Sequence, residues 1–165
     1  MVESRLYAGV GSRKTPHDVL KLMRRIAFHL AKQNWILRSG GARGADSAFE
    51  AGASLTDEAG ASLTEIFYAN DATPAAIEMA AKYHPTWDRC NPGVRKLHGR
   101  NNMILLGKDL TVPVGAVICW TPGGSGEGGT GQAIRVAQAH EIPVLDMGSK
   151  EGLKYITDKL AKWDS

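Results

Sequence analysis

Short apolar runs alternate along this chain with longer segments in which apolar residues recur at helical spacing. A short apolar run suits a buried strand, and a helical segment between two such runs suits the crossover that joins parallel strands. The pattern therefore predicts an α/β fold. We expect a single domain over residues 1–165, because a chain of this length with 43% hydrophobic residues buries a sufficient core without disulfides or metal.

The expected strands are the apolar runs at 6–10, 35–38, 65–68, 116–120 and 143–146. The expected helices cover 16–33, 45–52, 74–83, 101–110, 131–140 and 152–163. Thr15 is predicted to cap the first helix, with Pro16 at the first helical position. Residues 84–98 contain prolines and a glycine without a clear period, so we expect an irregular excursion, a kind of segment that is often functional. A short echo of 51–57 in 59–65 is interpreted as a surface duplication.

Charge and cysteine content exclude several classes of protein. The net charge of +3 is too small to indicate nucleic-acid binding by itself. No apolar stretch approaches the roughly 20 residues of a membrane span, and no signal-peptide core follows the first residues, so a cytoplasmic protein without membrane contact is expected. Cys90 and Cys119 have no CxxC partner and no clustered histidines, so spacing predicts neither a disulfide framework nor a metal site, and no cofactor is expected.

Three glycine-rich turns follow predicted strands, and each leads into a helix. They are 9–13 (GVGSR), 39–46 (SGGARGAD) and 122–131 (PGGSGEGGTG). Loops that leave the carboxyl ends of parallel strands emerge on one edge of the sheet, and ligands bind there at the point where the strand order reverses. The three turns are therefore expected to meet at one edge.

Such turns suit a phosphate. Glycine lets a ligand approach backbone amides, and the start of a helix adds unpaired N–H groups and partial positive charge. The alternative is that the glycines only make tight turns, but three turns on one edge favour a phosphate or nucleotide ligand. The turns contain neither GxxxxGK[ST] nor GxGxxG. The predicted ligand-binding residues are Gly11, Ser12, Arg13, Ser39, Gly40, Gly41, Arg43, Gly44, Asn101, Gly123, Gly124, Gly128, Gly129 and Thr130.

Three charged residues are candidates for chemistry on such a ligand. Asp46 would contact the sugar of the ligand. The equally good alternative is that Asp46 only accepts hydrogen bonds from backbone amides at the start of a helix. Arg100 would clamp phosphate bidentately, and its alternative is a surface ion pair. Glu127 would face a sugar or cation, or would be a solvated loop acid.

Aromatic and histidine residues near these turns have two interpretations. His84 and His98 flank the predicted excursion with Trp87 between them, which suits either a lid that stacks on a base or a packed tryptophan beside solvent-facing histidines. Trp120, at the end of a predicted strand, suits a pocket wall or a core contact.

Taken in order, several of these pieces resemble the superfamily that groups the Smf/DprA proteins with the Lonely Guy proteins (SLOG), and within it the small stand-alone YspA-like members. The matching pieces, within residues 6–147, are Gly11-Ser-Arg13, the 39–46 turn, Arg100-Asn101, and the 122–130 turn ahead of a helix and a strand. The resemblance implies a Rossmann-like domain that binds nucleotides or nucleotide-derived ligands, commonly as a dimer.

Two branches of the superfamily imply different functions. Lonely Guy enzymes hydrolyse the N-glycosidic bond of nucleoside monophosphates, and His98-Gly-Arg100 resembles their histidine-x-arginine motif, but Ala133 stands where they carry a glutamate. The DprA branch, which binds single-stranded DNA, is similar at Gly11-Ser-Arg13, Asp46 and Arg100-Asn101. The hypotheses are thus a nucleotide-binding protein that hydrolyses the N-glycosidic bond of its ligand, a non-catalytic sensor or sequestering protein, and a DprA-like single-stranded DNA-binding protein.

Overall fold

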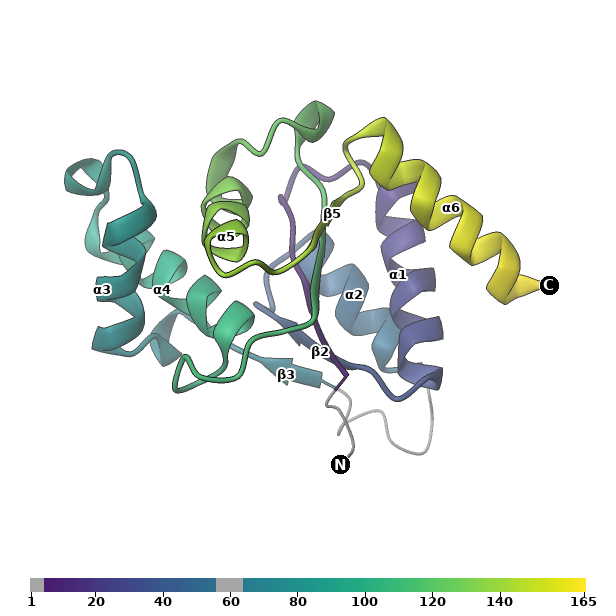
Figure 1. Ribbon diagram of the computed structural model, residues 1–165, viewed down its shortest axis with the longest axis horizontal. Coiled ribbons are helices and arrows are strands. Elements are labelled where there is room, and N and C mark those ends of the chain that lie inside the picture. Colours follow the sequence, from purple (N-terminus) through teal and green to yellow (C-terminus); the bar gives the residue numbers. More distant parts are fainter. Residues whose placement is uncertain (1–4, 56–63) are drawn as a thin grey trace.

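The computed structural model describes residues 5–55 and 64–165 and shows a parallel sheet between two layers of helices (Figure 1). The sheet has five strands in the order β3-β2-β1-β4-β5, and every neighbouring pair is parallel. The strands are β1 (Leu6–Gly9), β2 (Ile36–Ser39), β3 (Thr64–Ile66), β4 (Ala116–Cys119) and β5 (Val144–Asp146). The predicted α/β, Rossmann-like fold is confirmed.

Six α-helices flank this sheet in the described part of the chain. They are α1 (His17–Lys32), α2 (Ala45–Ala53), α3 (Pro74–Tyr83), α4 (Pro92–Leu106), α5 (Gly128–Ala139) and α6 (Lys150–Asp164). Figure 1 shows α1, α2 and α6 on one side of the sheet and α3, α4 and α5 on the other. Each side has its own apolar cluster, around Met23, Ile26 and Phe49 on the first side and around Ile104, Leu105 and Val136 on the second.

The order of the strands places a switch point between β1 and β4. From β1 the chain moves outward through β2 to β3, and it then returns to the other side of β1 to add β4 and β5. The loops that follow β1 and β4 therefore lead to helices on opposite faces, which opens a crevice at the carboxyl ends of these two strands.

Close packing of α1 on α2 depends on one glycine. A Cβ atom built on Gly52 would lie 2.1 Å from the carbonyl oxygen of Arg24, so a side chain at this position would push the two helices apart. On the same layer, Phe49 lies against Gly9, where a Cβ would meet its ring at 2.6 Å. These contacts hold α2 close to α1 and to the end of β1.

Three predicted boundaries are wrong. Helix α4 begins at Pro92, where the Asn91 side chain accepts a hydrogen bond from the Val94 amide at 2.9 Å, so the predicted irregular excursion over 84–98 is helical from Pro92 onward. The predicted helix over 101–110 is the second half of α4 and ends at Leu106. Helix α5 begins at Gly128, inside the glycine turn, and not at 131.

The predicted cap of the first helix is also wrong. The N-cap of α1 is Pro16 without a side-chain hydrogen bond, and the buried Thr15 donates its hydroxyl to the Ser12 carbonyl at 2.6 Å. The 59–65 copy of the short duplication lies largely outside the described residues. Within the described ranges no helix is long and apolar enough to cross a membrane.

Candidate functional site

A pocket of about 720 Å³ lies at the predicted edge of the sheet and contains residues of all three glycine-rich turns. The loop after β1 contributes 10–14, the loop after β2 contributes Ala42 and Asp46, and the loop after β4 contributes Trp120, Pro122 and 127–130. Helix α4 closes the pocket on the opposite side with Val94, Leu97, His98, Arg100 and Asn101. The predicted site residues among its lining are Gly11, Ser12, Arg13, Asp46, Arg100, Asn101, Glu127, Gly128, Gly129 and Thr130.

The other predicted ligand-binding residues shape the turns around the pocket and do not line it. Ser39 is buried and donates its hydroxyl to the Gly9 carbonyl at 2.6 Å. Gly44, at a φ of 85°, lies so close to the β1 loop that a Cβ would be 3.0 Å from the Ser12 carbonyl. Ligand contacts by this group stay predictions. Its members are Ser39, Gly40, Gly41, Arg43, Gly44, Gly123 and Gly124.

The first turn of α5 presents its backbone to the pocket. Glu127 is the N-cap residue and makes no side-chain capping hydrogen bond, and Gly128, Gly129 and Thr130 form the first turn of this 12-residue helix. A Cβ on Gly129 would have no atom within 4 Å, so the space above this turn is open. Uncapped amides at the positive end of a helix dipole favour an anion.

The loop before α5 is held in place by a partly buried hydrogen-bond network. The Asp146 carboxylate on β5 accepts hydrogen bonds from the amides of Thr121 and Gly148, both at 2.9 Å, and also from the Thr121 hydroxyl. The Thr121 oxygen in turn accepts from the Gly126 amide at 3.0 Å. These hydrogen bonds hold the loop in place without a ligand, and a preordered loop loses less entropy when a ligand binds.

The loop after β1 adds positive charge. The Ser12 hydroxyl oxygen accepts a hydrogen bond from the Lys14 amide at 2.9 Å, which turns the chain so that the exposed Arg13 and Lys14 border the pocket. Neither side chain forms an ion pair with any residue in 5–55 or 64–165. These two cations are available to a ligand.

Asp46 and Arg100, which both line the pocket, meet at Gly40. Arg100 is only 8% exposed, and its Nη1 donates to the Gly40 carbonyl at 2.8 Å while its Nε donates to the Asn101 side chain at 2.9 Å. A Cβ on Gly40 would lie 2.5 Å from Arg100 Nη1 and 2.8 Å from Asp46 Oδ2. The missing side chain at Gly40 lets both charged groups approach the same backbone segment, and the surface ion pair considered for Arg100 is excluded.

The carboxyl group of Asp46 has an unsatisfied oxygen. Its Oδ2 accepts a hydrogen bond from the Ala42 amide at 3.2 Å, as a residue at a helix start does, but its buried Oδ1 makes no hydrogen bond of normal geometry within the described residues. Burial raises the pKa of Asp46 to about 6, although the Ala42 amide, the Arg100 guanidinium and the nearby Ser39 and Gly40 groups partly oppose this rise. Burial also lowers the pKa of Arg100, and the charge of Asp46 opposes that shift. A buried acceptor of this kind suits a hydroxyl group of a ligand.

The two histidines lie together on the pocket wall. His98 is 6% exposed and His84 is half-buried, with 4.8 Å between their ring centroids, so the interpretation as solvent-facing histidines is wrong. The pKa of His98 is lowered to about 4, mainly by burial and to a smaller extent by the positive groups of His84, Arg135 and Arg100. The Trp87 ring packs against both imidazoles and does not line the pocket, whereas Trp120 does.

Several lining residues were not singled out from the sequence. Lys14 directly follows the first turn, and Val94 and Leu97 lie on α4, in a part of the helix that the sequence analysis does not predict. The cap and proline at 91–92 are the signal that identifies this helix start. Ala133 also lines the pocket, so the position at which the resembled hydrolases carry a glutamate does face the pocket, but here it carries a methyl group.

Comparison with known families supports the resemblance over the first part of the chain. Residues 1–66 match the family model described as DNA recombination-mediator protein A. This range includes Gly11-Ser-Arg13 and Asp46, and it ends before Arg100 and the third glycine turn. No curated protein and no solved structure matched the chain.

Proposed function

We propose that this pocket binds a nucleotide or a nucleotide-derived ligand by its phosphate group. One observation carries the proposal: the uncapped first turn of α5 and three cationic side chains, Arg13, Lys14 and Arg100, border a single cavity. Helix N-termini bind phosphate through their amides, and arginine adds bidentate contacts to phosphate oxygens. A pocket with both elements selects a ligand that carries a phosphate.

The rest of the pocket suits a nucleoside. Its volume of about 720 Å³ falls within the usual range of roughly 300–1,000 Å³ for small-molecule sites. Trp120, Val94 and Leu97 offer apolar surface to a base, and the free Oδ1 of Asp46 can accept a hydrogen bond from a sugar hydroxyl. Because the phosphate-binding turn and Asp46 lie in the same cavity, one ligand can contact both.

Calorimetric titration tests this proposal with a panel of nucleoside monophosphates and the matching nucleosides. We expect the monophosphates to bind and the nucleosides to bind at least about 10-fold more weakly, because loss of charge-assisted hydrogen bonds costs roughly 1.5–3 kcal/mol each. Gly129→Ala places a methyl group in the open space above the first turn of α5 and is expected to weaken monophosphate binding without loss of stability.

Gly93→Ala is the matched control. Gly93 is the second residue of α4 as Gly129 is of α5, it does not line the pocket, and a Cβ there meets only Asn91 Oδ1, at 3.4 Å. Equal effects of the two substitutions on binding, or equal affinities for nucleosides and monophosphates, would contradict the proposal.

A second candidate function is binding of single-stranded DNA through the same phosphate-binding elements. The match of residues 1–66 to the DNA recombination-mediator family favours it, and the exposed Arg13 and Lys14 lie on the pocket rim. Salt titration of binding to single-stranded oligonucleotides tests it, because neutralised phosphates give a steep linear fall of log affinity with log salt. Absence of binding at low salt eliminates this function and leaves mononucleotide binding untouched.

Hydrolysis of the N-glycosidic bond is the enzymatic form of the first proposal. Asp46, with a pKa near 6 and an unpaired oxygen, is suited to proton transfer or to stabilising charge on the sugar near neutral pH. Incubation with nucleoside monophosphates should then release free base, and Asp46→Asn should abolish the release. Recovery of the intact monophosphate from a tight complex supports a non-catalytic sensor or sequestering protein.

The resemblance also implies a dimer, and sedimentation of the purified protein tests that oligomeric state.

A further inference from the structure

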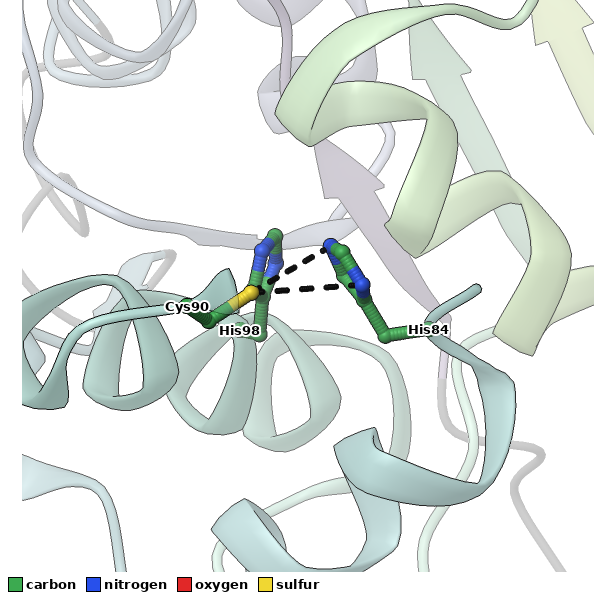
Figure 2. A group of neighbouring side chains, drawn as sticks. All are labelled: His84, Cys90 and His98. Carbon is green, nitrogen blue, oxygen red and sulfur yellow. Dashed lines mark hydrogen bonds between the residues drawn. The ribbon is translucent and has the colours of Figure 1, made fainter. Parts of the chain in front are cut away.

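Three side chains with metal-binding atoms converge beside the pocket. His84 follows α3, Cys90 follows the short η3 turn (Trp87–Arg89), and His98 lies within α4 (Figure 2). Their ligand atoms all lie within 4.8 Å of one another, and Cys90 Sγ is 3.6 Å from His84 Nε2. Figure 2 shows the two imidazole rings side by side next to the sulfur, with dashed lines from the sulfur to both nitrogens of His84. Imidazole nitrogen and thiolate sulfur are the ligands that zinc and similar ions prefer.

We propose that His84, Cys90 and His98 form a three-ligand site for a divalent transition-metal ion of the zinc class, whose fourth coordination position opens on the pocket. Zinc–sulfur and zinc–nitrogen bonds of about 2.3 and 2.05 Å at tetrahedral angles separate sulfur from nitrogen by about 3.6 Å. The pair Cys90 and His84 already has this separation. Closure of the site around an ion then requires His98 to approach by no more than about 1.5 Å, since two nitrogen ligands lie about 3.3 Å apart and none of the atoms is beyond 4.8 Å.

Hydrogen bonds explain the positions of His84 and Cys90 without a metal ion, but they do not explain the position of His98. The Thr86 amide donates to His84 Nδ1 at 3.1 Å, His84 Nε2 contacts the Cys90 sulfur, and that sulfur lies 3.7 Å from the Thr86 carbonyl. His98 is outside this ring of contacts, and its buried Nδ1 has no hydrogen-bond partner in the part of the chain that the structure describes. A metal ion bound to the three side chains would give this buried imidazole the partner that it lacks.

The charge around the site makes the Cys90 thiolate necessary for binding a cation. Arg100 and Arg135 are near enough to act electrostatically on His98. Two neutral imidazoles would leave a divalent ion uncompensated beside these arginines, whereas the Cys90 thiolate supplies one negative charge. On binding, the thiol proton leaves to solvent as the sulfur–metal bond forms, so one proton is released per ion. The proton on His84 Nε2 moves to Nδ1, and the exposed Thr86 amide exchanges its bond to Nδ1 for water.

Two of the three ligands, His84 and His98, line the pocket, which is why the fourth position faces it. Sites with three protein ligands keep such a position for water or a ligand oxygen. The three-ligand site depends only on its own side chains. The identity of the fourth ligand as a phosphate oxygen rests on the proposed function.

Titration of the whole chain with cobalt(II) tests the metal site without reference to activity. We expect one ion per chain, a near-ultraviolet band from cobalt–thiolate charge transfer, and the strong visible absorption of tetrahedral cobalt. Cys90→Ser should abolish the charge-transfer band, and His98→Gln should weaken cobalt binding by more than about 100-fold, since even residues that only orient metal ligands account for 10- to 100-fold. Cys119→Ala and His17→Gln are the controls, because Cys119 lies in the core and His17 on the surface of α1.

Absence of the charge-transfer band in the wild-type protein, or an unchanged band in Cys90→Ser, overturns the proposal. Circular dichroism of each variant separates loss of a ligand from loss of the fold. Inorganic phosphate added to the cobalt form should shift the visible bands, and an unchanged spectrum overturns the open fourth position. Calorimetric titration of phosphate into the metal-free protein separates that result from failure of phosphate binding itself.

Discussion

The buried carboxyl group of Asp46 makes the stability of this protein depend on pH in a defined direction. Burial raises the pKa of Asp46 from 3.8 to about 6. The side chain is only 5% exposed, so solvent screens this effect little. One pKa unit corresponds to about 1.36 kcal/mol, and the shift therefore costs the folded protein about 3 kcal/mol once the carboxyl group is ionised in both states.

The sign follows from proton binding. Between pH values of about 4 and 6 the folded protein retains a proton on Asp46 that the unfolded chain has lost, so the free energy of unfolding falls as pH rises through this window and stays low above it. Asp46→Asn removes the ionisation and keeps an oxygen that can accept from the Ala42 amide. The variant should therefore gain stability relative to wild type by up to about 3 kcal/mol between pH 4 and pH 7.

Urea denaturation followed by circular dichroism at several pH values between 4 and 8 measures this difference. Asp109→Asn, which removes an exposed carboxylate in a turn, controls for the change in net charge. A difference between Asp46→Asn and wild type that does not vary with pH would refute the reasoning, as would a wild type that gains relative stability as pH rises.

Three further outcomes are expected. Gly52→Ala should lower the unfolding free energy by at least about 1–3 kcal/mol in denaturant titrations, because a Cβ there would lie 2.1 Å from a carbonyl oxygen of α1. Burial raises the pKa of the Cys119 thiol, so a thiol reagent should modify only Cys90 in the native protein and both cysteines in urea, as counted by mass spectrometry. Replacement of Arg13 and Lys14 together by alanine should weaken phosphate binding and flatten its salt dependence in calorimetry, with an unchanged unfolding midpoint, since both side chains are exposed and unpaired in the described structure.

The edge of the sheet that carries the pocket could be predicted because its signals are local. Each glycine-rich turn directly follows an apolar run, and parallel strands bring such turns to one edge whatever their order. The β1 loop and the first turn of α5 lie where this argument places them. A periodic pattern and a glycine cluster are properties of neighbouring residues, so one sequence is enough to find them.

Which residues of each turn face the ligand depends on contacts between distant segments. Gly40 resembles Gly129 in the sequence, yet Gly40 packs against Arg100 and Asp46 while Gly129 faces open space. The difference arises because α4 crosses the loop after β2 and inserts a guanidinium there. No spacing rule contains that contact. The sequence therefore does not show that Gly40 packs against Arg100 and Asp46, whose side chains line the pocket, while direct ligand contacts by Gly40 stay a prediction.

The cluster of His84, Cys90 and His98 shows the same limit more sharply. Spacing predicts no metal site, because zinc-binding cysteines and histidines usually occur in close pairs, and these three residues lie in a segment expected to be irregular. Helix α4 starts at Pro92, and its first turns carry His98 back against the end of α3, while the η3 turn returns the chain and places Cys90 next to the two histidines. The unpredicted helix start is therefore the cause of the cluster. A sequence analysis that recognises Asn91 and Pro92 as a helix start places His98 two turns into a helix and predicts that the residues before it fold back on that helix.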